Sequence, residues 1–204
     1  MANLTLILGG ARSGKSRYAQ EYAAKLAVDA PVTYIATAQA GDDEMHDRIR
    51  RHKADRPANW HTVEEPLEVA ETIRRIAVGP HPTPLSGKDR DQVGRAVVLM
   101  DCLTFFVVNH MLREGDAATC DTETWDVDGA ELAVDHLVDA IGDVDADVVI
   151  VSNEVGMGLV PETALGRAFR DVAGRANQKV AASADTVLFM VAGIPMTVEG
   201  GDRT

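Results

Sequence analysis

Residues 9–16, Gly-Gly-Ala-Arg-Ser-Gly-Lys-Ser, match the phosphate-binding loop pattern G-x-x-x-x-G-K-[ST] at every fixed position. The glycines let the backbone turn so that successive N–H groups can face phosphate oxygens, and a following helix would add its positive N-terminal end. Lys15 can reach the outer phosphates, and the Ser16 hydroxyl can bind Mg²⁺. The spacing therefore predicts a nucleoside triphosphate site with a magnesium ion. The alternative is a glycine-rich turn that carries Lys-Ser by chance.

An acidic residue, Asp101, directly follows the apolar run of residues 96–100. A carboxylate at the end of a strand can hold Mg²⁺ through water or accept a hydrogen bond from a substrate hydroxyl. We therefore predict Ser16 and Asp101 as metal ligands. A second interpretation stays open, in which Asp101 caps the helix that is expected to follow.

A histidine on a predicted helix is the candidate nucleophile. The helix is expected over residues 42–54, which begin with acidic and end with basic side chains, as the helix dipole favours. Met45, Ile49 and His52 are spaced i, i+4 and i+7, so they would share the face toward the body of the protein. A neutral imidazole can attack phosphorus, although by position alone a histidine on an apolar face is more often structural. His46 lies about 240° around the helix from His52 and is expected to face solvent.

Alternating strands and helices are expected to position these residues. Apolar runs predict strands at residues 4–8, 32–36, 96–100, 148–152 and 186–191. Periodicity predicts helices from the phosphate loop to residue 26 and over residues 42–54, 67–77, 103–112, 131–141 and 162–184. Residues 78–95, residues 113–128 and the polar tail after Pro195 are expected to lie outside them.

This alternation indicates an α/β fold with a mostly parallel, doubly wound sheet. Together with the phosphate-loop motif at residues 9–16, it leads us to expect a P-loop NTPase (RecA-like) fold. Ligands bind at the carboxyl ends of the strands of such sheets. That rule selects residues 9–16, 36–38, 101–104 and 153–158.

The composition is typical of one globular domain spanning residues 1–204, with 46% hydrophobic and 25% charged residues. The net charge of −12 disfavours nucleic acid and acidic membranes as partners, so local basic positions must bind a polyanionic substrate. Cys102 and Cys120 lack metal-ligand spacing, and a buried thiol is expected at Cys102. Neither a signal peptide nor a membrane span is expected, which predicts a cytoplasmic protein.

Motifs along almost the whole chain resemble one family. They are GGARSGKS at 9–16, YIAT at 34–37, His52-Lys53 with Arg56-Pro57, Trp60, Thr62 and Glu64, DCLT at 101–104, NEVGMGLVPE at 153–162 and FRDVAGRANQ at 169–178. These motifs are similar to those of the bifunctional adenosylcobinamide kinase / adenosylcobinamide-phosphate guanylyltransferase of cobalamin biosynthesis. The longer motifs are far more specific than the phosphate loop alone.

The resemblance implies two reactions. In the first, ATP or GTP phosphorylates the aminopropanol hydroxyl of adenosylcobinamide. In the second, GTP guanylylates a histidine, matched here by His52. The GMP then passes to adenosylcobinamide-phosphate, giving adenosylcobinamide-GDP and pyrophosphate. The residues implied in nucleotide binding are Gly9, Gly10, Ala11, Arg12, Ser13, Gly14, Lys15, Ser16, Ala36, Thr37, Ala38, Lys53, Ala54, Asp55, Arg56, Glu64 and Asp101.

The chain also departs from the family pattern. Arg51 precedes a single His52 where some members carry two consecutive histidines, and Asp101 stands where some have glutamate. The loop at 78–95 is longer than usual.

The resemblance further implies a homotrimer. Two other functions stay open: a monofunctional small-molecule kinase with a structural His52, and a nucleotide-gated switch with residues 78–95 as effector surface.

Overall fold

The computed structural model describes residues 2–27, 30, 32–39, 41, 43–54, 56–78, 95–112 and 125–200. Within these ranges, seven strands form one sheet in the order β3-β2-β4-β5-β1-β6-β7. The strands are β1 (Asn3–Gly9), β2 (Val32–Ala36), β3 (His61–Glu64), β4 (Ala96–Asp101), β5 (Ala146–Asn153), β6 (Thr186–Val191) and β7 (Ile194–Glu199). All neighbouring strands are parallel except β6 and β7, which confirms the predicted mostly parallel sheet.

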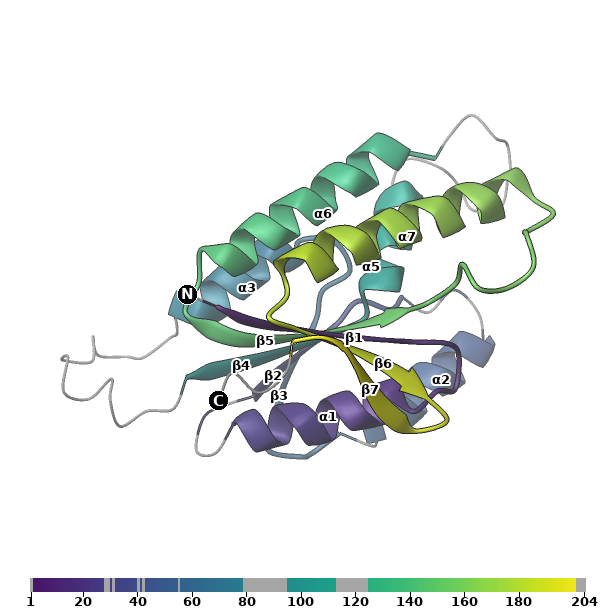
Figure 1. Cartoon of the computed structure of the whole chain (residues 1–204). Coiled ribbons are helices and arrows are strands. Elements are labelled where there is room, and N and C mark those ends of the chain that lie inside the picture. The colour runs from purple at the N-terminus through teal and green to yellow at the C-terminus, as the bar shows by residue number, and fades with distance from the viewer. Residues whose placement is uncertain are drawn as a thin grey trace.

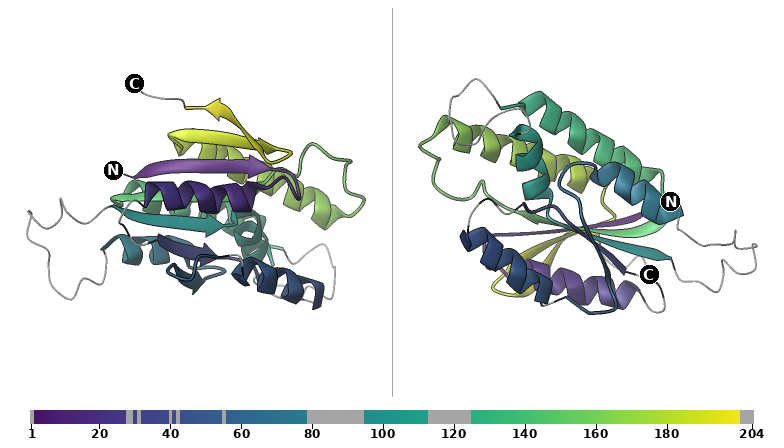
Figure 2. Two further views of the ribbon diagram at one scale, coloured as in Figure 1. Left: turned by 90° about the horizontal axis from the view of Figure 1, so that it is seen from below. Right: turned by 180° about the vertical axis from the view of Figure 1, so that it is seen from behind.

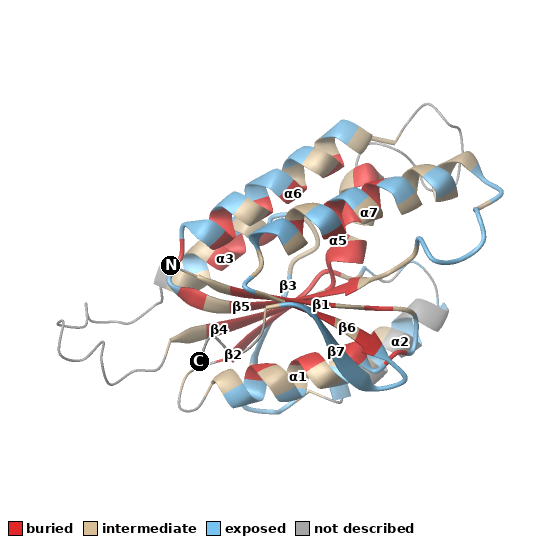
Figure 3. Cartoon of the chain, viewed as in Figure 1, coloured by how far each residue is buried: buried red, intermediate tan, exposed pale blue. Residues whose placement is uncertain are grey.

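Helices cover both faces of the sheet (Figure 1). The helices are α1 (Lys15–Leu26), α2 (Asp43–Ala54), α3 (Val69–Val78), α5 (Leu103–Met111), α6 (Val127–Gly142) and α7 (Ala164–Ser183). One apolar cluster fills the space between the sheet and α3, α5, α6 and α7, and a second joins the other face to α1. Figure 3 shows that the buried residues concentrate in the central strands and on the sheet-facing sides of the helices. The fold is thus doubly wound, as the sequence predicts. No helix in the described ranges combines the length and apolarity that crossing a membrane requires.

Parallel pairing brings the functional segments to one edge of the sheet. Gly9 at the end of β1 pairs with Asn153 at the end of β5. Ala36 at the end of β2 pairs with Glu64 on one side and Asp101 on the other. In the left view of Figure 2 the arrowheads of β1, β2 and β4 point toward the same end of the molecule, where α2 lies. The segments selected from the sequence therefore meet in space.

The two outermost strands were not expected from the sequence. β3 and β7 each pair with one neighbour only, and nearly all of their residues are exposed. β7 corrects the expectation of a polar tail after Pro195: β6 and β7 form a hairpin whose two turn residues, Ala192 and Gly193, have φ of 52° and 82°. Two positive φ values suit a tight hairpin because they match the twist of the strands. Proline is tolerated in β7 because an edge strand has donors that need no partner.

Several helices begin at other residues than predicted, because side chains cap them. α6 begins four residues early at Val127, since the Asp126 carboxylate accepts a hydrogen bond from Gly129 N at 2.7 Å. α3 begins late because Glu65 Oε1 accepts from the N–H groups of residues 67 and 68. Residues 79–94 and 113–124, most of the two predicted loops, lie outside the described residues.

Candidate active site

The predicted phosphate loop turns tightly from β1 into α1. Gly14, the residue before α1, has a φ of 90°, a conformation that favours glycine. A Cβ at Gly9 would lie 2.6 Å from Ser13 Oγ and 3.0 Å from the carbonyl oxygen of Met190, so only glycine fits there. Lys15 is buried, and its ammonium donates to the carbonyl of Gly10 at 3.0 Å. The loop thus curls around the ammonium that would contact phosphate.

The β6–β7 hairpin supports this loop from behind. Gly193 N donates to the carbonyl of Ser13 at 2.9 Å. A Cβ on Gly14 would lie 3.2 Å from the Cα of Gly193, so the two glycines are in close approach. The turn of this hairpin, which the sequence did not predict, therefore helps to hold the phosphate loop in place.

A cavity of about 440 Å³ opens at the carboxyl ends of the strands. Its lining combines the end of the phosphate loop, the ends of four strands and one side of α2. The lining residues are Lys15, Ser16, Tyr34, Ala36, Ala38, Gln39, His46, Ile49, His52, Lys53, Arg56, Glu64, Pro66, Asp101, Cys102, Phe105 and Asn153. Three cations, Lys15, Lys53 and Arg56, border it although the chain carries a net charge of −12. This is the local basic site that the composition required.

Tyr34 connects two of the predicted site residues. Its hydroxyl donates to Asp101 Oδ2 at 2.8 Å, and the Arg56 guanidinium lies 3.8 Å from the centre of its ring. Burial, and then the charge of Asp101, raise the pKa of Tyr34, so the phenol stays protonated and remains a donor. Nε and Nη1 of Arg56 are buried and have no hydrogen-bond partner in the described ranges. They can serve an anionic group of a ligand.

The interpretation of Asp101 as a helix cap is wrong. The N-cap position of α5 is occupied by Cys102, and no side chain caps this helix. The Asp101 carboxylate instead faces Tyr34 and the cavity. Ser16 and Asp101 thus present a hydroxyl and a carboxylate to one space. Oxygen donors of this kind suit Mg²⁺, which keeps several waters or phosphate oxygens in its shell.

Cys102 is buried, as expected, and plays a structural part. Its N–H donates to Thr37 Oγ1 at 2.8 Å, and that hydroxyl donates back to the Cys102 carbonyl at 2.7 Å. Asn109 continues the link, since its amide donates to the carbonyls of Thr37 and Pro66. Burial, and then the charge of Asp101, raise the pKa of the thiol to about 12, so it is no nucleophile near neutral pH.

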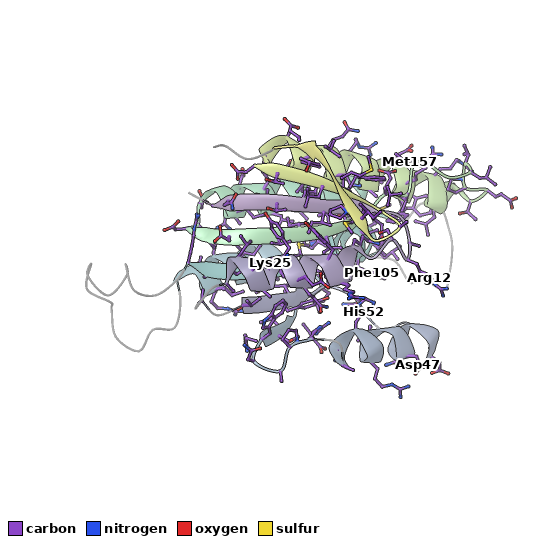
Figure 4. The ribbon with its side chains drawn as sticks, turned by 60° about the horizontal axis from the view of Figure 1, so that its bottom comes forward. Arg12, Lys25, Asp47, His52, Phe105 and Met157 are labelled. Atoms are coloured by element: carbon purple, nitrogen blue, oxygen red, sulfur yellow. The ribbon has the colours of Figure 1, made fainter. Side chains whose placement is uncertain are left out.

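Helix α2 carries the candidate nucleophile along one wall of the cavity. Ile49 and His52 both line it, as the predicted helix face requires. Figure 4 shows His52 on the side of α2 toward the sheet, near Phe105, and Asp47 on the opposite side. The next residue, Lys53, forms an ion pair with Glu64 of β3, which ties the end of α2 to the sheet.

The expectation for His46 needs a correction. His46 is exposed, as predicted, but it also lines the cavity, so it shares with His52 the side of α2 from which it was excluded. The two residues are about 120° apart by the shorter way around the helix. The cavity is wide enough to reach both.

Not all predicted nucleotide-binding residues line the cavity. Gly9, Gly10, Ala11, Arg12, Ser13, Gly14, Thr37 and Ala54 are not among its lining residues, and Asp55 lies outside the described residues. The first six belong to the phosphate loop, whose backbone N–H groups rather than side chains would bind phosphate. Ala54 is exposed at the end of α2.

Sequence reasoning missed Tyr34 and Phe105 as residues of the cavity wall, and it selected the segment 153–158 without giving Asn153 a role. One signal was available for Tyr34, because a tyrosine in a fully buried strand needs a hydrogen-bond partner for its hydroxyl. Asn153 lies in a motif that contributed to the resemblance without receiving a role. Nothing in the sequence distinguishes Phe105 from a core residue of α5.

Comparisons with known proteins show the family of this chain. The family described as cobinamide kinase / cobinamide phosphate guanyltransferase matches residues 5–198. The bifunctional adenosylcobalamin biosynthesis protein CobP of Pseudomonas aeruginosa is 43% identical over 96% of this chain and 96% of its own. The bifunctional adenosylcobalamin biosynthesis protein CobU of Salmonella typhimurium is 41% identical over 96% of this chain and 99% of its own.

Among solved structures, a prototypical ATPase from the type III secretion system of pathogenic bacteria aligns with a TM-score of 0.56. The alignment covers 96% of this chain and 56% of the ATPase at 12% identity, so the likeness concerns the fold alone. An ATPase fold agrees with the phosphate loop at the end of β1. On the family match and the two close relatives, the chain belongs to the cobinamide kinase / cobinamide phosphate guanyltransferase family.

Proposed function

We propose that this chain is a two-step enzyme that phosphorylates adenosylcobinamide with ATP or GTP and then transfers GMP from GTP to adenosylcobinamide-phosphate. The observation that carries the proposal is that Lys15 of the phosphate loop and His52 of α2 line the same cavity. A triphosphate site alone suits any kinase, whereas a histidine beside it supplies the nucleophile that GMP transfer requires. Family membership gives the two substrates.

In the kinase step, the residues that follow β1 and end β4 bind the nucleoside triphosphate and its metal ion. The phosphate loop and Lys15 hold the triphosphate. Ser16 and Asp101 would hold Mg²⁺, which would supply positive charge to offset that of the transferred group. The substrate hydroxyl oxygen bonds to the γ-phosphorus as the bond to the β–γ bridging oxygen breaks. The hydroxyl proton is released and the nucleoside diphosphate leaves.

In the transfer step, α2 supplies the reacting atom. A neutral ring nitrogen of His52 forms a bond to the α-phosphorus of GTP, and pyrophosphate leaves as the α–β bridge breaks. Lys53 and Arg56 offset the charge that develops on the phosphate oxygens. A phosphate oxygen of adenosylcobinamide-phosphate then bonds to the same phosphorus, the P–N bond breaks, and adenosylcobinamide-GDP forms with a neutral His52.

The test uses GTP labelled at either the α- or the γ-phosphate, followed by denaturation of the protein. We expect acid-labile, base-stable label from the α position only, and none in His52→Ala. His46→Ala is the matched control, because His46 lies on the same helix and lines the same cavity. If His52→Ala keeps the label, His52 is not the nucleophile. If no variant is labelled but cobinamide is still phosphorylated, the chain is a monofunctional kinase.

The phosphate-loop assignment has its own test. Lys15→Ala should lose phosphorylation of cobinamide, because it removes the ammonium around which the phosphate loop curls. Undiminished kinase activity in this variant would refute the assignment.

We also propose that the chain forms a homotrimer. The support from the structure is the exposed edge of the sheet, where Ile194, Met196 and Val198 of β7 are 65%, 55% and 65% exposed. Apolar side chains gathered in this way mark contact surfaces. Light scattering behind a sizing column measures the mass, and a monomer of 21.9 kDa at micromolar concentration would refute the proposal.

A further inference from the structure

Asn153 ends β5, the strand that lies between the phosphate-loop strand β1 and the Asp101 strand β4. It pairs with Gly9 in register and lines the cavity together with Lys15 and Asp101. Its side chain is therefore placed where the outer phosphates of a nucleotide would lie, and the mechanism above gives it no task.

A series of hydrogen bonds links Asn153 to Asn177, Ser152 and Thr104. The acceptor at one end of the series determines which group donates in each bond. The Asn153 backbone carbonyl can only accept, so Asn177, 3.2 Å away, must turn its Nδ2 toward it. Asn177 Oδ1 then faces Ser152 Oγ at 2.6 Å, and the Ser152 hydroxyl must donate. Asn177 and Ser152 are 7% and 2% exposed, so water does not compete for these bonds.

The donors and acceptors between Ser152 and the cavity follow in the same way. The single hydroxyl proton of Ser152 is used, so its oxygen accepts from Thr104, whose Oγ1 lies 3.4 Å away. The Thr104 oxygen is then an acceptor for Asn153, whose backbone N and Nδ2 lie at 2.9 and 3.1 Å. The Asn153 amide is thereby fixed in one of its two flips. Its Oδ1, which has no hydrogen-bond partner in the described part of the chain, is left for the cavity.

We propose that Asn153 Oδ1 accepts a hydrogen bond from an O–H group beside the phosphate that is transferred in the kinase step. A carbonyl oxygen carries partial negative charge, so it repels phosphate oxygens and selects a donor. Two donors have this chemistry: the attacking hydroxyl of the substrate and a water held by Mg²⁺. Thr104, Ser152 and Asn177 act through Asn153 and are positioning residues. The inference rests on the proposed kinase reaction.

The first test replaces Asn153 by leucine, which has a similar size and no acceptor. The kinase kcat should fall about 100- to 1,000-fold, the range for loss of one oriented hydrogen bond in a transition state, while binding of a fluorescent GTP analogue changes less than about twofold. A kcat equal to that of wild type overturns the proposal. The His52 label from α-labelled GTP should still form in this variant. If wild type itself transfers no phosphate, the proposed function has failed instead.

A second pair of variants tests the orientation without touching Asn153. Thr104→Val removes the acceptor that fixes the amide, so the kinase kcat should fall about 3- to 10-fold, whereas Thr104→Ser keeps the hydroxyl and should restore it. Equal rates in the two variants overturn the proposal even if Asn153→Leu does not fold.

The dependence on Mg²⁺ identifies the donor. If the donor is a metal-held water, the Mg²⁺ concentration for half-maximal rate rises in Asn153→Leu. If it is the attacking hydroxyl, that concentration is unchanged and the loss is in kcat and kcat/KM for cobinamide. Either result supports the hydrogen bond, and a loss confined to nucleotide KM overturns it.

Discussion

Tyr34→Phe separates the two contacts that Tyr34 makes. The substitution removes the hydroxyl that donates to Asp101 at 2.8 Å and keeps the ring on which Arg56 lies at 3.8 Å. A hydrogen bond to a charged group contributes about 1.5–3 kcal/mol. Asp101 is only partly buried and borders the cavity, so water can replace the hydroxyl in part. We therefore expect the free energy of unfolding to fall by about 1–2 kcal/mol.

The same substitution should change how the enzyme uses Mg²⁺. Tyr34 holds one carboxylate oxygen of Asp101 and leaves the other for the metal, so its loss lets the carboxylate turn. The Mg²⁺ concentration for half-maximal kinase rate should rise about tenfold or less, since about 1.4 kcal/mol corresponds to a factor of ten. Tyr34→Leu also removes the ring under Arg56, a contact of about 0.5–2 kcal/mol, and should weaken GTP binding as well.

Alkaline unfolding gives an independent check on Tyr34. Its pKa is raised in the folded protein, whereas in the unfolded chain a tyrosine ionises near pH 10, so above that pH the folded state binds more protons. Wild type should therefore lose up to about 1.4 kcal/mol of stability per pH unit above about pH 10 through this residue, and Tyr34→Phe should not. Identical urea midpoints, alkaline slopes and Mg²⁺ dependence in wild type and Tyr34→Phe would refute the role of the hydroxyl.

Three further predictions concern the neighbourhood of the cavity. Gly14→Ala should lower the free energy of unfolding by about 1–2 kcal/mol because φ there is 90°, whereas Gly10→Ala, with open space around its Cβ, should cost less in the same thermal melt. Lys53→Ala should weaken GTP binding by titration yet shift stability by less than about 1 kcal/mol, since its ion pair with Glu64 is half exposed; a large loss of stability would contradict this. In a Cys120→Ser background, the Cys102 thiol should resist a disulfide reagent at pH 8 until the protein unfolds, because its pKa is raised to about 12; rapid reaction of folded protein would show that it is accessible.

The sequence predicts the central part of the fold well because strands that are buried on both faces consist of continuous apolar runs. β1, β2, β4 and β5 are apolar runs covered on both faces, and their functional residues follow directly after them. The edge strands β3 and β7 leave no such pattern, since neither has a buried face. β7 also contains Pro195, which argues against a strand everywhere except at an edge.

The sequence predicts many of the individual site residues but not the contacts between them. The phosphate loop, His52, Glu64 and Asp101 carry recognisable residue types at recognisable spacings. The bond between Tyr34 and Asp101, 67 residues apart in the chain, depends on the pairing of β2 with β4, which local periodicity does not encode. His46 was misplaced for a related reason, because a helical projection gives angles around one helix and not the width of the cavity beside it.

The contact between Gly193 and Ser13 joins the first loop of the chain to its last hairpin. During synthesis, residues 10–14 leave the ribosome before β6 and the turn that supports them, which follow about 180 residues later. β1 also cannot pair with neighbouring strands until β5 and β6, its partners on either side, have been synthesised. A nascent chain therefore carries the whole phosphate-loop sequence long before it can hold the loop in shape. Competence to bind nucleotide is therefore acquired only after β6 and the turn that follows it have been synthesised.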